Sequence, residues 1–223
     1  MKNSTYKLAF LLSGFLLLSL ICFFSQAVAD SKIVVGNFSQ NDMSDWKPHN
    51  FQGSTHYTLT KENKRSFLKA VSQSAASGLI KKQQIDLQKT PYLNWQWKVE
   101  SALYRLTETF KNGDDFAARI YVVSDGGVFF WNTLALNYVW SSGQKSNTVW
   151  DNPFTANAKM MAIESGNEFK GQWRSEKRNV LADLRSAFGK DFRFIDAIAI
   201  MTDTDNSGQS ATAYYGDIYF TDK

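Results

Sequence analysis

Residues 92–100 read YLNWQWKVE, and the alternation in this stretch decides the fold. Apolar side chains stand at every second position, at Leu93, Trp95, Trp97 and Val99. Because successive side chains of a β-strand point to opposite faces, these four residues share one face and their polar neighbours share the other. The stretch therefore predicts a half-buried strand.

Similar apolar runs recur along the chain, separated by clusters of Gly, Asn, Asp and Ser. They span residues 33–35, 57–60, 67–72, 79–87, 116–123, 128–131, 134–140, 160–164, 195–201 and 214–220. Many short strands joined by polar turns are typical of two antiparallel sheets packed on one another. We expect an all-β protein with an antiparallel, jelly-roll-like β-sandwich.

One segment, SEKRNVLADLRSAFGKD at residues 175–191, has helical spacing instead. Its apolar residues Val180, Leu184 and Phe188 recur at intervals of four. Ser175 is suited to cap the start of a helix, and Gly189 is suited to end it. The pattern predicts one short helix near residues 176–188 that caps one end of the sandwich.

The amino end has the features of a secretory signal peptide. Lys2 and Lys7 precede an apolar run at residues 8–24, and small residues at 27–29 form an A-x-A cleavage site. We expect residues 1–29 to be removed after Ala29, which predicts a periplasmic or secreted protein. An uncleaved anchor helix is the alternative, although Ser13 and Gly14 interrupt the run.

Residues 30–223 are then expected to form a single β-sandwich domain. Cleavage removes the only cysteine, Cys22, so this domain has no disulfides and must be stabilised by burial of apolar side chains. Aromatic residues are plentiful, with 17 Phe, 9 Tyr and 7 Trp in the whole chain. Loss of two lysines lowers the net charge from +4 to +2. No Lys/Arg cluster supports nucleic-acid binding, and we expect no membrane partner after signal cleavage.

Polar groups on two of the predicted strands point to a ligand-binding surface. Arg119 and Tyr121 share the less apolar face of residues 116–123, and an arginine in mid-strand requires a partner or a ligand. Aromatic rings flanked by amide and guanidinium groups suit sugars. The candidate ligand-binding residues are Arg119, Tyr121, Asn137, Tyr138, Trp140, Trp173, Asp203 and Asp205. The competing interpretation places the rings in the core and pairs Arg119 with Asp203 or Asp205.

The stretch DTDNSG at 203–208 resembles the start of a calcium loop. Asp203, Asp205 and Ser207 match the first ligands of an EF-hand, but the twelfth position holds Tyr214 instead of the bidentate Glu. The flanking residues also have strand composition. We therefore interpret the stretch as the connection before the last strand and expect no cofactor, with a calcium site at these three residues as the alternative.

Several catalytic chemistries lack their motifs in this chain. It has two histidines, His49 and His56, and neither G-x-S-x-G nor H-E-x-x-H. Paired carboxylates remain a route to glycan hydrolysis. The acids that could serve are Asp114, Asp115, Glu164, Glu176, Asp203 and Asp205.

Five motifs in one order carry a resemblance to a known family: TPYLNWQWKV from Thr90, GDDFAARIYVV from Gly113, NYVW from Asn137, RNVLADLRSAFG from Arg178 and AIMTDTDNSGQSATAYYGDIYF from Ala199. Together they resemble the bacterial exported family called domain of unknown function 3047. The resemblance implies a jelly-roll-like sandwich similar to carbohydrate-binding modules. It implies no established activity from which catalytic residues could be transferred.

The sequence thus favours an exported, non-catalytic binding protein whose ligand is a glycan or envelope polysaccharide. The alternative is a glycan-active hydrolase or lyase that uses carboxylates, Arg119 or a tyrosine. A second alternative is a structural envelope protein that binds another protein.

Overall fold

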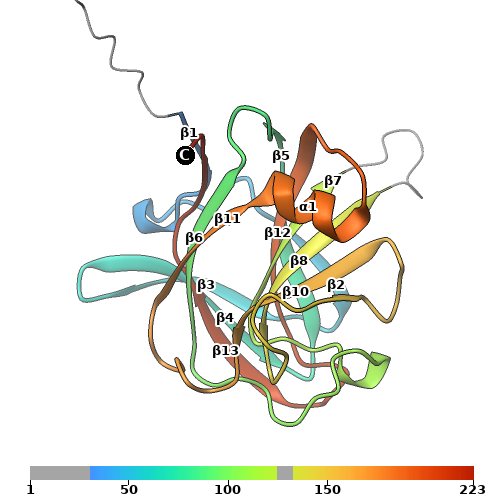
Figure 1. The fold of residues 1–223 in the computed structure, drawn as a ribbon. Coiled ribbons are helices and arrows are strands. Elements are labelled where there is room, and N and C mark those ends of the chain that lie inside the picture. The colour runs from blue at the N-terminus through green and yellow to red at the C-terminus, as the bar shows by residue number, and fades with distance from the viewer. Residues whose placement is uncertain (1–30, 125–132) are drawn as a thin grey trace, which may run out of the picture.

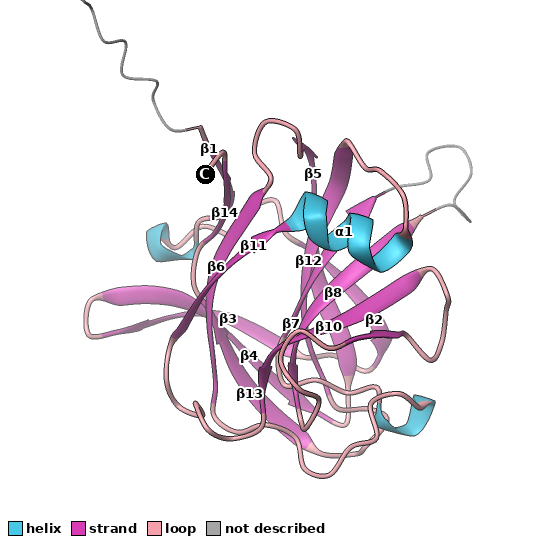
Figure 2. Ribbon diagram, in the orientation of Figure 1, coloured by secondary structure: helices cyan, strands magenta, loops and turns pink. Residues whose placement is uncertain are grey.

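The computed structural model describes residues 31–124 and 133–223, which form two β-sheets packed face to face (Figure 1). The strand expected at 128–131 lies outside the described residues. Figure 2 shows that strands build both layers and that helices are confined to short segments at the periphery. No helix in the described ranges has the length and apolar character needed to cross a membrane.

Each sheet has seven strands within the described residues. The first sheet has the order β1 (Lys32–Gly36), β14 (Ile218–Thr221), β6 (Tyr92–Val99), β13 (Ser210–Tyr215), β4 (Arg65–Gln73) and β3 (His56–Glu62), with β11 (Arg174–Asn179) also paired to β6. The second has the order β2 (Lys47–Gln52), β5 (Ala76–Asp86), β12 (Phe194–Asp203), β7 (Arg119–Ser124), β8 (Leu134–Ser141), β10 (Ala158–Ser165) and β9 (Val149–Asp151). Two short 3-10 helices, η1 (Phe38–Gln40) and η2 (Lys111–Gly113), and one α-helix, α1 (Val180–Phe188), complete the fold.

The predicted all-β sandwich is confirmed, with two corrections to its strands. The pairing is not antiparallel throughout, because β8 and β10 run parallel, with Met160 opposite Asn137. The chain between them is long enough to cross back to the starting end of the sheet and carries β9. The run at 214–220 is two strands, β13 and β14, with a break at Gly216 and Asp217.

Aromatic rings from both sheets fill the space between them. The alternation on β6 places Trp95 and Trp97 inside, each at most 1% exposed. Trp95 stacks on Tyr138 of β8 with ring centres 5.4 Å apart, and Trp97 lies 5.8 Å from Trp140 of the same strand. This contact across the interior fixes which faces of β6 and β8 point outward.

The capping helix is present but starts later than the sequence predicts. Residues 174–179 extend along β6 as β11, so Ser175 lies in a strand and Asn179 caps the helix, accepting a hydrogen bond from the Ala182 amide at 3.0 Å. Pairing with β6 satisfies the backbone of this polar segment, which outweighs its modest preference for helix. Gly189, with φ of 67°, ends the helix as expected.

Helix α1 is tied to both sheets at one end of the sandwich (Figure 1). Asp183 accepts hydrogen bonds from Tyr138 of β8 at 3.0 Å and from Arg178 of β11 at 2.8 and 2.9 Å. A single buried carboxylate therefore joins the helix to a strand of each layer.

Replacement of Trp140 by Ala tests the assignment of this ring to the interior. The substitution leaves a large cavity between the sheets, so we expect it to lower the free energy of unfolding by about 3–5 kcal/mol. Urea denaturation followed by circular dichroism measures the loss. Phe154→Ala is the control, since that ring is 53% exposed. Equal stability of the two variants would contradict the core assignment.

Candidate functional site

The outer face of the second sheet carries a groove of about 360 Å³. Cross-strand pairing assembles it: Arg119 lies opposite Met201, Tyr121 opposite Asn137, and Ala76 opposite Asp203. The groove is lined by Phe51, Ala76, Asp114, Arg119, Tyr121, Asn137, Asn152, Phe154, Thr155, Ala158, Met201, Asp203, Asp205 and Asn206. The small side chains of Ala76 and Ala158 leave room above the sheet.

Arg119 is the central charged group of the groove and is only 4% exposed. Its Nε donates to Asp203 Oδ1 at 2.9 Å, and its Nη2 donates to Asp203 Oδ2 and, at 3.1 Å, to the Asp114 carbonyl. Burial acts to lower the pKa of Arg119, but the acidic groups around it, first Tyr121 and then Asp114, raise it overall. The guanidinium is therefore charged and held rigidly between β7 and the end of β12.

Two buried oxygen atoms in the groove accept no hydrogen bond from the described part of the chain. They are Oδ1 of Asp114 and Oδ1 of Asn137, whose residues are 5% and 1% exposed. The opposite atoms are occupied, because Asn152 Nδ2 donates to Asp114 Oδ2 at 2.9 Å and Asn137 Nδ2 donates to the Lys159 carbonyl at 3.2 Å. Unpartnered buried acceptors are costly, so they mark places where a donor from a ligand would be favourable.

The burial of Asp114 also affects its protonation. Desolvation raises the pKa of this carboxyl group above its ordinary value, and the charge of Arg119 opposes that shift. Asp114 thus differs from Asp203 in degree, because Arg119 Nη1 lies 3.9 Å from Asp114 Oδ2, whereas the guanidinium forms hydrogen bonds with both carboxylate oxygens of Asp203.

Two phenylalanine rings give the groove an apolar wall. Phe51 is 66% exposed and Phe154 is 53% exposed, an unusual position for side chains of this size. The His49 ring packs edge-on against Phe51 at 4.6 Å, and Lys111 Nζ lies 5.2 Å from the Phe154 ring. Exposed rings held beside buried polar groups form a typical surface for an amphipathic ligand.

The structure brings five of the eight predicted ligand-binding residues together in the groove: Arg119, Tyr121, Asn137, Asp203 and Asp205. It does not bring Tyr138 and Trp140 there, because both project inward from β8 and are at most 1% exposed. Trp173 lies just before β11, where its ring packs 5.3 Å from that of Phe67 in β4 of the first sheet.

Sequence reasoning missed the two aromatic residues of the wall. Phe51 lies at a bulge in β2 and Phe154 in the loop after β9, so neither belongs to an alternating apolar pattern. The only available signal was a single phenylalanine within a polar segment, HNFQG and DNPFT.

Of the other acids that the sequence offered, Glu164 and Glu176 lie outside the groove. Burial, reinforced by the Glu164 charge, raises the pKa of Glu176 to about 7.

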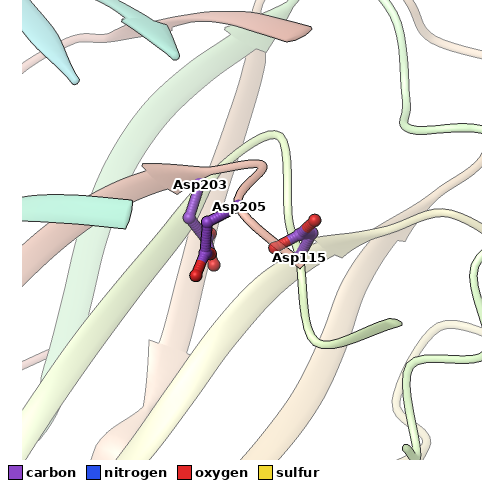
Figure 3. A group of neighbouring side chains, drawn as sticks. All are labelled: Asp115, Asp203 and Asp205. Atoms are coloured by element: carbon purple, nitrogen blue, oxygen red, sulfur yellow. The ribbon is translucent and has the colours of Figure 1, made fainter. Parts of the chain in front are cut away.

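Three carboxylates lie close together, as Figure 3 shows: Asp115, Asp203 and Asp205, each with an oxygen within 4.8 Å of the others. Asp203 and Asp205 line the groove. The cluster contains Asp115 in place of the predicted Ser207, whose Oγ accepts from the Gln209 amide at 3.3 Å. Carboxylate oxygens suit calcium. All three already have partners in the protein: Arg119 binds Asp203, the Asn206 and Ser207 amides donate to Asp115 at 3.2 and 2.6 Å, and Asn206 Nδ2 donates to Asp205 Oδ1 at 3.2 Å.

Replacement of Asp205 by Asn tests whether this cluster holds a cation. Desolvation, with repulsion from Asp115, raises the pKa of Asp205 in the folded state. The ionised carboxylate therefore destabilises the fold, and this cost disappears as pH falls through the raised pKa. Without a cation, we expect the free energy of unfolding of the variant at pH 7 to exceed that of the wild type by less than about 1 kcal/mol, because the group is partly solvated. The variant should therefore melt at a slightly higher temperature.

Differential scanning calorimetry with and without calcium measures this effect, and Asp191→Asn at an exposed ion pair is the control. A lower melting temperature in Asp205→Asn, together with calcium stabilisation of the wild type alone, would instead show a bound cation.

Comparison with known proteins gives a family match and likenesses of fold. The family described as a protein of unknown function (DUF3047) matches residues 44–219, and no curated protein matches the chain. The chain is similar in fold to a carbohydrate-binding module of family 29, with 8% identity, 87% of this chain and 90% of that chain covered, and a TM-score of 0.41. It is also similar to the family 30 module of a cellulosomal cellulase of Clostridium thermocellum, with 14% identity, 87% and 94% covered, and a TM-score of 0.44. A family 29 module from Piromyces equi has 11% identity, with 88% of this chain and 93% of that chain covered and a TM-score of 0.40.

Proposed function

The chain belongs to the DUF3047 family of proteins of unknown function, and from the chemistry of its own groove we propose that it is a non-catalytic protein that binds a glycan. The observation that carries the proposal is the pairing of two exposed phenylalanine rings with two buried, unpartnered oxygen atoms in one groove. Sugars have both complementary parts, namely apolar C–H faces and hydroxyl donors.

The ligand's hydroxyl groups would donate to Asp114 Oδ1 and Asn137 Oδ1, which lack partners among the described residues. Its C–H face would pack on Phe51 or Phe154, whose rings are already held at the surface. Three carboxylates and one guanidinium line the groove, from Asp114, Asp203, Asp205 and Arg119. This excess of negative charge favours a neutral glycan over an acidic one.

A glycan hydrolase is the second candidate function, and one observation favours it. Asp114 and Asp203 line the same groove, yet burial raises the pKa of Asp114 while Arg119 binds Asp203 directly. Two carboxyl groups in such different environments are what an acid and a base require.

Removal of the two rings tests the binding proposal. We expect Phe51→Ala and Phe154→Ala each to weaken binding of soluble neutral oligosaccharides, from glucan, xylan and mannan, by about 3- to 10-fold, because each loses a stacking surface. Isothermal titration calorimetry measures the affinities. The matched control is Tyr104→Ala, which removes an exposed ring, 65% accessible, outside the groove lining.

If a variant that carries both Phe51→Ala and Phe154→Ala binds these oligosaccharides as tightly as the wild type, this site is refuted. New reducing ends released from the same polysaccharides, and lost in Asp114→Asn, would establish the hydrolase instead.

We also infer that the protein is exported, from the signal features of residues 1–29. Mass spectrometry of the protein recovered from the periplasm or the medium is expected to show a chain that begins at Asp30. Substitution of both Ala27 and Ala29 by Leu should block this cleavage, since the peptidase requires small residues there. A mature protein that retains residues 1–29 would contradict the inference.

A further inference from the structure

A second hollow lies on the outer face of the first sheet, beside the link between β13 and β14. β13 and β14 pair with successive parts of β6. On their other edges, β13 pairs with β4 and β14 pairs with β1. Gly216 and Asp217 link β13 to β14, and a hollow of about 400 Å³ opens beside them. It shares no lining residue with the groove on the second sheet.

Two cations line this hollow without a carboxylate partner among the described residues. The Arg65 guanidinium lies 4.1 Å from the centre of the Trp173 ring, and its Nη2 donates to Gln96 Oε1. Lys177 Nζ lies 4.9 Å from the Tyr92 ring. Stacking and one hydrogen bond orient the guanidinium and leave its other N–H groups available.

Two acids, Asp217 and Glu176, also line the hollow, and neither forms an ion pair with these cations among the described residues. Asp217 is occupied by Ser39, whose amide and hydroxyl donate to its two oxygens at 2.8 and 2.6 Å. Glu176 turns toward the interior, where Trp97 Nε1 donates to it at 3.3 Å. Because burial raises the pKa of Glu176 to about 7, the two cations outnumber the ionised carboxylates that line the hollow.

Hydrogen-bond donors are also in excess there. Gln96 Nε2 donates to Ser175 Oγ at 2.7 Å, which leaves the Ser175 hydroxyl hydrogen free to donate into the hollow. Gly216 makes this arrangement possible, because a Cβ at that position would lie 3.1 Å from Gln96 Cβ and 3.3 Å from Arg65 Nη2. Orientated donors with unpaired positive charge complement an oxyanion.

We propose that this hollow is a second binding site, which holds an oxyanion through Arg65, Lys177 and Ser175. A carboxylate of an acidic sugar and a phosphate ester share the required chemistry. The site does not depend on the function proposed for the groove, which favours neutral ligands and lies on the other sheet.

Titration of the full-length protein with inorganic phosphate and with glucuronate, at constant ionic strength maintained by potassium chloride, tests the proposal. We expect at least one of the two anions to raise the melting temperature, with the rise growing as the logarithm of the anion concentration above the dissociation constant. Phosphate alone would indicate a phosphate ester, and glucuronate alone an acidic sugar. In Arg65→Gln and in Lys177→Gln the dissociation constant obtained from these curves should rise about tenfold, because each variant loses a charge-assisted contact.

Lys82→Gln is the matched control, since it removes an exposed lysine from the second sheet and should leave the titration unchanged. Lys177 is itself exposed, so its variant is expected to fold even if Arg65→Gln does not. No rise in melting temperature with either anion at constant ionic strength, or an equal loss of affinity in Lys82→Gln and Lys177→Gln, would overturn the site.

Discussion

The contact between the rings of β6 and the rings of β8 determines the rest of the structure. Trp95 and Trp97 meet Tyr138 and Trp140 across the interior, and all four are almost fully buried. Because side chains alternate along a strand, burial of Tyr138 and Trp140 turns Asn137 outward. The apolar contact that stabilises the sandwich thus also places one of the polar groups of the groove.

The groove and the hollow both lie on outer faces of the sheets, where strand pairing rather than core packing determines which side chains lie next to one another. On the second sheet, pairing brings carboxylates around a single buried arginine, Arg119, and leaves a negative surplus. On the first sheet, the break between β13 and β14 lies beside Arg65 and Lys177, which have no carboxylate partners among the described residues. Opposite electrostatic surpluses on the two faces give each site its own class of ligand.

Much of the fold could be predicted, since strand alternation is a local pattern. The strand at 92–99 and the two faces of residues 119–123 follow from spacing alone, whereas Phe116 lies before β7 and packs with Val139 and Met160 apart from the main core. Residues 174–179 could not be assigned in this way, because their polar composition suits either a strand or the start of a helix. Pairing with β6, distant in the chain, makes them a strand.

The sequence by itself determined that the protein is an all-β sandwich with one capping helix and that Arg119 requires a partner, because periodicity and an unpaired mid-strand charge are properties of a few consecutive residues. Only the tertiary structure decided that Asp203 is that partner, that Trp140 faces inward, and that Phe51 and Phe154 flank one groove. Alternation shows that two faces of a strand differ, but long-range pairing decides which side chains become neighbours.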